Sequence, residues 1–196
     1  VLFRSLEETL RAPDPTALRP ARIAATWRVV LAEPRSRPFV AIGVLALSAL
    51  VLYLVSAPAL FMTRYGLGPR GFALVGAAAA AGSLLNARLA RRLKLERTIA
   101  LGLALGLAAT LANLALYLAG LDGPRAILPG LALFFLAFGL VAANAGALAL
   151  QPHGTIAGRA AGVVGVLQTV LPGCLAGLVA VLADGDPLGL LAGMPL

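Results

Sequence analysis

The feature that most constrains this chain is a series of long apolar stretches separated by short charged ones. The first stretch runs from Phe39 to Met62 and contains no charged residue. A helix of roughly 20 apolar residues crosses a hydrocarbon core of about 30 Å. The predicted spans cover residues 39–62, 71–89, 99–121, 126–150 and 157–183. A sixth apolar stretch, 187–196, is too short to cross and is predicted to be the start of a further span.

The composition favours a bilayer environment. Hydrophobic residues make up 60% of the chain and charged residues 12%, whereas soluble domains carry about 25% charged residues. The chain also holds 22 Gly and 13 Pro, which membrane helices tolerate better than soluble ones. Intrinsic disorder is excluded because the chain is too apolar. We therefore expect an all-α fold, a polytopic membrane helix bundle.

The basic residues predict an orientation for this bundle. The net charge is +8, and thirteen of the sixteen Arg and Lys residues lie in segments 1–37, 88–98 and 151–159. Five crossings place these three segments on the same side, which the positive-inside rule assigns to the cytoplasm. A nucleic-acid partner is not favoured, because such sites interleave basic and aromatic residues on one face. The lipid bilayer is the expected partner.

Residues 1–38 are predicted to form a cytoplasmic linker that contains a short amphipathic helix. Ile23, Trp27, Val30 and Leu31 recur at helical spacing, and the basic residues lie mostly off that stripe. Our interpretation is a helix on the membrane surface with Trp27 at headgroup depth; the alternative is a solvated linker. The chain begins without Met and ends in an apolar stretch, so we expect a fragment of a longer protein.

No catalytic or metal-binding signature is present, and we expect neither an enzyme nor a cofactor. The single cysteine, Cys174, cannot form an internal disulfide or a Cys-ligated metal framework. The predicted spans contain no Asp, Glu or Lys at membrane depth, where such residues usually mark proton or ion paths. The single histidine, His153, lies between the fourth and fifth spans. We interpret it as a turn residue; a gating or pH-sensing role is the alternative.

Several stretches resemble those of a known family. They are Leu6 to Leu10, Tyr53 with Ser56-Ala57-Pro58, Tyr65-Gly66-Leu67, Gly82 to Arg88 followed by Arg91-Arg92, and Pro152-His153-Gly154 leading to Gln168. Together they resemble the second half of the Bcr/CflA branch of drug:proton antiporters in the major facilitator superfamily. The resemblance covers nearly the whole chain. The last two stretches are its more specific parts.

This resemblance implies a transporter of twelve helices built from two six-helix halves. The chain would be the C-terminal half, with helices seven to eleven and the start of twelve. The implied activity is proton-coupled efflux of lipophilic drugs or small metabolites across a bacterial inner membrane by alternating access. The coupling acid would lie in the missing first half. The alternative is a non-transporting membrane module that only packs with a partner half.

The resemblance also ranks the residues that would line a substrate cavity, because helices seven and ten line the cavity in this fold. The candidates are Tyr53, Phe134, Phe138, Asn144 and Gln168. An apolar, weakly polar cavity suits a small lipophilic substrate. The alternative is that the polar groups only form hydrogen bonds between helices, each worth about 0.6 kcal/mol. The aromatic side chains would then serve packing.

Two further sets of residues are candidates for movement or contact between halves. Pro58, Pro172 and Gly173 are predicted kink or gating positions, because proline removes a backbone donor; a static kink is the alternative. Asn86, Arg88, Arg91 and Arg92 resemble a degenerate copy of the superfamily's cytoplasmic loop motif. The alternative is a topology determinant that contacts anionic lipid. Close helix packing is predicted at the pairs Gly102/Gly106, Gly158/Gly162 and Gly173/Gly177.

Overall fold

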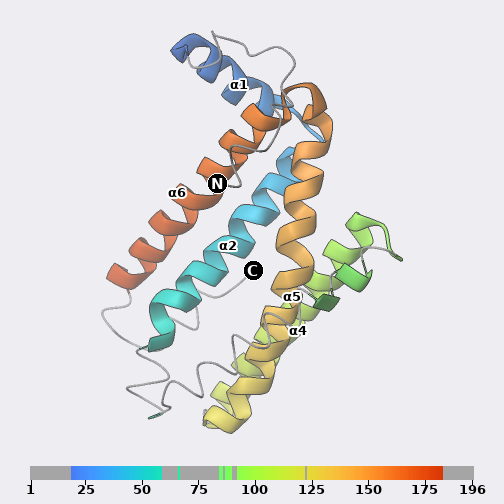
Figure 1. Ribbon diagram of the computed structural model, residues 1–196. Helices are drawn as coiled ribbons and strands as arrows, with labels where there is room; N and C mark the ends of the chain where they lie inside the picture. The colour runs from blue at the N-terminus through green and yellow to red at the C-terminus, as the bar shows by residue number, and fades with distance from the viewer. Residues whose placement is uncertain are drawn as a thin grey trace, which may run out of the picture.

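A computed structural model of the chain describes residues 19–58, 66, 84–85, 87–89, 92–121 and 123–182. All the regular elements within these residues are helices (Figure 1). They are α1 (Pro20–Ala32), α2 (Arg37–Pro58), α4 (Leu95–Leu118), α5 (Pro124–Leu150), the short 3₁₀ helix η3 (Gln151–Ile156) and α6 (Ala157–Leu182). The predicted all-α class is confirmed for this part of the chain. Most of the predicted span 71–89, and all of segment 187–196, lie outside the described residues.

Within the part of the chain that the structure describes, three helical stretches are long and apolar enough to cross a membrane: Arg37–Ser56, Leu95–Leu118 and Pro124–Val179. The third has 56 residues, or about 84 Å at 1.5 Å per residue, which greatly exceeds the hydrocarbon thickness. It does not form one straight rod, because His153 inside η3 has non-helical dihedral angles (φ −105°, ψ 24°). Figure 1 shows α5 and α6 running in opposite directions on either side of η3.

The helices pack in an order that differs from their order in the chain. α4 packs against α5, α5 against α2, and α2 against α6. The consecutive helices α5 and α6 make few contacts with each other, because α2 lies between them (Figure 1). The helix α1 lies across the end of the bundle where α2 and α6 begin. α4 begins one turn before the predicted span, so Arg97 belongs to the helix.

The helix pair with the most extensive contact, α4 and α5, meets along a seam of small residues. Gly102, Gly106 and Ala109 are buried on one face of α4. A methyl group at Gly102 would lie 2.7 Å from the Val141 side chain and 3.1 Å from the Ala137 carbonyl oxygen. Only glycine lets the two backbones approach this closely. The close packing predicted at Gly102 is confirmed.

The glycines of α6 behave differently. A methyl group at Gly158, Gly162, Gly173 or Gly177 would meet no described atom within 4 Å. The same applies to Gly165. The glycine pairs of α6 therefore form no seam with another described helix.

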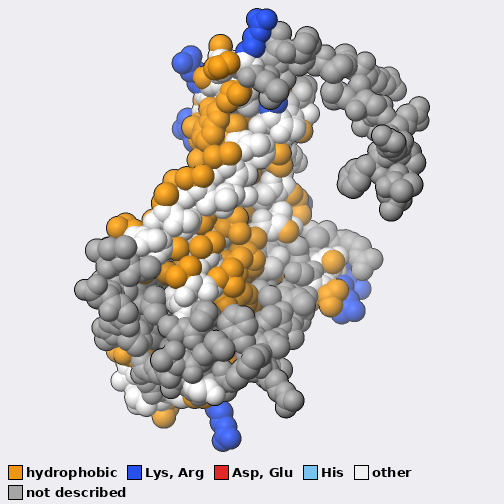
Figure 2. Space-filling model, turned by 60° about the vertical axis from the view of Figure 1, so that its left-hand side comes forward, with side chains coloured by type: hydrophobic (Ala, Val, Ile, Leu, Met, Phe, Trp, Pro, Cys, Tyr) orange, Lys and Arg blue, Asp and Glu red, His pale blue; other side chains and the backbone are white. Residues whose placement is uncertain are grey.

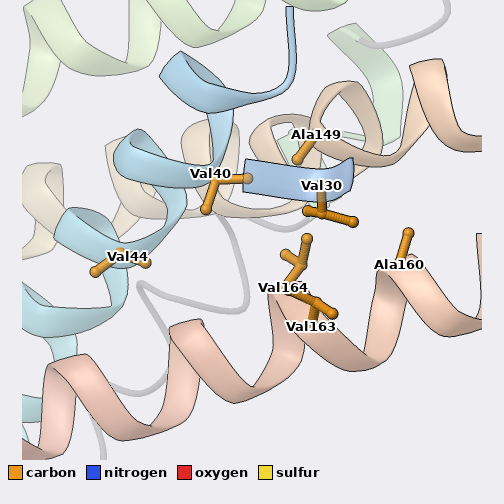
Figure 3. Close-up of a cluster of buried hydrophobic side chains, with 7 residues drawn as sticks. All are labelled: Val30, Val40, Val44, Ala149, Ala160, Val163 and Val164. Atoms are coloured by element: carbon orange, nitrogen blue, oxygen red, sulfur yellow. The ribbon is translucent and has the colours of Figure 1, made fainter. Parts of the chain in front are cut away.

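Two clusters of buried side chains hold α2 between α5 and α6. One is aromatic: the ring of Tyr53 meets the ring of Phe135 edge-on at 4.7 Å, and Phe134 meets Phe135 at 5.8 Å. Such edge-to-face pairs are favourable by about 0.5–1.5 kcal/mol beyond the area they bury. The other cluster is aliphatic and joins α1, α2, α5 and α6 (Figure 3). It consists of Val30, Val40, Val44, Ala149, Ala160, Val163 and Val164.

The helix α1 is docked on the bundle by one edge of its predicted apolar stripe. Val30 is buried and Trp27 half-buried against the aliphatic cluster, whereas Ile23 and Leu31 are exposed. The junction to α2 is held by two side-chain hydrogen bonds. The Ser36 hydroxyl donates to the Ala149 carbonyl oxygen at 2.7 Å, and Arg37 Nε donates to the Leu31 carbonyl oxygen at 2.6 Å.

Candidate functional site

An apolar cavity of about 230 Å³ lies between α2, α4 and α5. The wall contributed by α5 lies between the walls contributed by α2 and α4, because both α2 and α4 pack against α5. The residues that face the cavity are Ile42, Leu45, Ala46 and Ala49 from α2, Gly102, Leu103 and Gly106 from α4, and Phe134, Ala137, Phe138 and Val141 from α5.

Several residues in the walls of the cavity are small. Gly106 on α4, Ala46 and Ala49 on α2 and Ala137 on α5 add little side-chain volume to the lining, whereas the place that a side chain of Gly102 would take is already filled by α5. Among the described residues of the lining, Phe134 and Phe138 are the aromatic side chains. These described residues offer ring faces and methyl groups and include no charged group.

The cavity lies near the middle of the helices that form it. Residues 42 to 49 are central in the membrane-length stretch Arg37–Ser56, and residues 134 to 141 are central in α5. A ligand in the cavity would therefore lie near the midplane of a bilayer crossed by these helices. Sites of this kind occur at the midplane in secondary transporters.

The five cavity residues predicted from the sequence occupy three different environments. Phe134 and Phe138 line the cavity. Tyr53 lies one helical turn beyond Ala49 on the same face of α2 and packs edge-on against Phe135. Asn144 is buried on α5 just beyond Val141, and its Nδ2 donates to the Leu140 carbonyl oxygen at 2.6 Å. Tyr53 and Asn144 thus flank the cavity at opposite ends without lining it.

Gln168 lies away from the cavity, on α6. Its amide packs against Gly43, where a methyl group would overlap it. Gly43 is buried on α2, so the body of α2 stands between Gln168 and the cavity lining on α5. The roles of Tyr53, Asn144 and Gln168 in substrate binding remain predictions.

The predicted kink positions are placed as follows. Pro172 is buried inside α6, and the helix continues through it to Leu182. Because proline has no N–H, the carbonyl of Gln168 lacks its usual helical donor. Gly173 follows on the same helix, and Pro58 is the last residue of α2.

The predicted loop motif is described only in part. Arg88 and Arg92 are exposed, and with Leu85 and Leu89 they line a shallow pocket. Asn86 and Arg91 lie outside the described residues.

Two buried groups were not ranked highly from the sequence. His153 is 4% exposed, and within the described residues its Nε2 has no hydrogen-bond partner. Asn113 is placed against Gly130 between α4 and α5, and its Oδ1 likewise has no partner there. Neither could be found by spacing alone, because burial at a turn or a seam depends on the helix that packs against it. The described residues contain no group of three His, Cys, Asp or Glu that could hold a metal ion.

Comparisons with family models, with curated proteins and with solved structures found no match for this chain.

Proposed function

We propose that this chain is the C-terminal half of a secondary active transporter of the major facilitator superfamily, of the Bcr/CflA type. It would export lipophilic drugs or small metabolites across a bacterial inner membrane, with residues 1–38 in the cytoplasm. The observation that carries the proposal is the apolar cavity between α2, α4 and α5, with Phe134 and Phe138 in its wall. The residues quoted for the resemblance supply the family.

The size of the cavity supports a binding site that is shared with the other half of the transporter. Its volume of about 230 Å³ is below the roughly 300–1,000 Å³ of pockets that enclose a drug-sized ligand. It would therefore hold one part of a ligand, while a second half of the transporter supplies the remaining wall. This matches a site formed between two rocking halves.

The chemistry of the lining supports low selectivity. Lipid tails are as apolar as the lining, so a lipophilic ligand entering from the bilayer gains little from hydrophobic transfer. The free energy that favours the cavity over the bilayer would come from shape and from ring contacts with Phe134 and Phe138, at about 0.5–1.5 kcal/mol per aromatic pair. Compounds with different polar groups but similar apolar shape would therefore be accepted.

Proton coupling requires a carboxylate that this cavity does not provide. None of the described residues that line it titrates, and the coupling acid is expected in the other half of the protein.

The test uses the full-length transporter in inverted membrane vesicles. Phe138→Ala enlarges the cavity and removes a ring contact, so drug efflux should fall about tenfold, equivalent to roughly 1.4 kcal/mol, at unchanged membrane abundance. Leu111→Ala, which removes a side chain that is 55% exposed on α4, is the matched control. Unchanged efflux after both Phe134→Ala and Phe138→Ala would remove this cavity from the transport path.

The open glycine face of α6 favours the second hypothesis, a non-transporting module that packs with a partner half. Gly158, Gly162 and Gly165 would meet no described atom even with an added methyl group. Co-purification with a partner half without substrate-dependent flux in liposomes would support this hypothesis. Flux from this chain alone would refute it.

A further inference from the structure

A second apolar depression, a groove of about 350 Å³, lies where α1, α2 and α6 meet. Its apolar walls are formed by Val30, Leu31, Val40, Val44, Leu167 and Leu171, with Ala41 and Leu45 along α2. One charged residue, Arg37, also lines it. Of these residues, only Leu45 also faces the cavity between α2, α4 and α5. The groove is thus a separate feature on another side of α2.

The groove has a charged end and an apolar length. Arg37, Ala41 and Val44 follow each other at i, i+4 and i+7 on one face of α2. From residue 37 to residue 45 the groove extends about 12 Å at 1.5 Å per residue. One leaflet of the hydrocarbon core is about 15 Å thick. A groove that starts at the first residue of a membrane-length helix therefore follows one leaflet from the interface inward.

Arg37 is held at the mouth of the groove. Its Nε donates to the Leu31 carbonyl oxygen at 2.6 Å, which fixes the guanidinium beside the end of α1. A guanidinium carries five N–H donors, so four remain on its two outer nitrogens to meet a phosphate. Arginine is well suited to this contact, because its planar fork matches phosphate oxygens.

The surroundings of Arg37 are basic. Between residues 19 and 37 the chain carries Arg19, Arg22, Arg28, Arg35 and Arg37 against a single acid, Glu33. Glu33 accepts a hydrogen bond from the backbone N–H of Arg35. Figure 2 shows basic side chains gathered at the end of the molecule that carries α1, with hydrophobic side chains along the face below them. A positive end above an apolar face complements an anionic headgroup above its acyl chain.

We propose that this groove binds one anionic phospholipid, with its phosphate at Arg37 and an acyl chain along Val44 and Leu171. The lipid would fill the angle between α1, α2 and α6 and stabilise the docked position of α1. This proposal does not depend on transport by the intact protein.

Trp27 gives a direct readout, because it is the only tryptophan of the chain. It packs against the aliphatic cluster that includes the groove residues Val30, Val40 and Val44. The full chain is reconstituted in vesicles that contain brominated phosphatidylglycerol or, separately, brominated phosphatidylcholine, and quenching of Trp27 fluorescence is measured. We expect at least threefold stronger quenching per mole of the anionic lipid.

Two variants and two controls test the site. Arg37→Gln removes the headgroup contact and should abolish the preference for the anionic lipid. Ala41→Phe fills the groove without changing charge and should reduce quenching by the anionic lipid to the level of phosphatidylcholine. Arg22→Gln removes an exposed charge outside the groove, and Ala108→Phe adds the same ring to an exposed position of α4. Both controls should keep the wild-type preference.

Three outcomes would overturn the proposal. Equal quenching by the two lipids in the unchanged chain would mean that the groove has no anionic lipid in it. An equal loss for Arg22→Gln and Arg37→Gln would indicate a diffuse attraction to the membrane surface. Unchanged quenching for Ala41→Phe would mean that another part of the chain, or a second copy, covers the groove. An unshifted Trp27 emission maximum before quenching verifies that each variant keeps α1 docked.

Discussion

The α4–α5 pair and the α2–α6 pair are both built from apolar helices, but the glycines of α4 and α6 lie differently. Gly102 of α4 faces its partner helix, whereas in the α2–α6 pair the close glycine contact is made by Gly43 of α2 against Gln168 and not by the glycines of α6. On α4, Gly102 faces side chains of α5 so closely that a methyl group would clash. On α6, the residues that meet α1 and α2 are the branched side chains Val163 and Val164 (Figure 3), and Gly162 and Gly165 face away from any described atom. The number of glycines in a helix therefore does not show whether the helix packs closely against a neighbour. The face on which the glycines lie determines whether they take part in such packing.

The two pairs also leave different spaces. Beside the glycine seam, a cavity lies near the middle of the helices. Beside the valine cluster, a groove begins at the first residue of α2, Arg37, which lies at its mouth. The first space offers apolar and aromatic contacts only, whereas the second pairs a cation with an apolar channel. Three substitutions, each with a matched control, would test this comparison.

The largest effect is expected from filling the seam. Gly102→Leu should lower the free energy of unfolding by about 3 kcal/mol, because neither Val141 nor the Ala137 backbone can make room for a large side chain. The matched change on α6, Gly162→Leu, should cost less than about 0.5 kcal/mol, as expected for a surface position. Unfolding in mixed detergent micelles, followed by circular dichroism, measures both. Equal losses would mean that the face of α6 that carries Gly162 has a close partner too.

A smaller effect is expected at the hydrogen bond that ties the start of α2 to the end of α5. The Ser36 side chain is fully buried and donates to the Ala149 carbonyl oxygen. Ser36→Ala should lower the unfolding free energy by about 1–1.5 kcal/mol. Ser48→Ala is the control, because its hydroxyl bonds only the Val44 carbonyl oxygen of its own helix. If Ser48→Ala costs as much, the contact between the two regions adds nothing beyond local bonding.

The smallest effect is a gain. Gly165→Ala should raise the unfolding free energy by about 0.5 kcal/mol, since alanine restricts the unfolded chain and its methyl group meets no described atom. Gly120→Ala also adds a methyl group in open space, but Gly120 has a φ of +73°, so about 1 kcal/mol should be lost. A stability gain for Gly165→Ala combined with impaired pairing to a partner half would locate that partner on α6.

The sequence predicted the all-helical class and the presence of membrane-length helices, which the described residues confirm; the roles of the site residues stay predictions. Phe134 and Phe138 were predicted as cavity residues, and they line the cavity because both lie on the face of α5 that contains Val141. Tyr53, also predicted as a cavity residue, lies one turn beyond the lining residue Ala49 on α2 and packs against Phe135; its role in substrate binding stays a prediction. Gln168 was grouped with them, although α6 turns it toward Gly43. The amphipathic stripe of α1 was visible in the sequence, but its docking against α2 and α6 was not.

By itself, the sequence determined that the chain is rich in apolar helices long enough to cross a membrane. Those properties are local, since they depend on hydrophobic content, chain length and the position of Pro, Gly and charge. Only the tertiary structure decided which faces meet. A helix that is apolar all round carries no stripe that marks its inner side, so the contact at Gly102, the open face at Gly165 and the mouth of the groove at Arg37 arise from how neighbouring helices fit together.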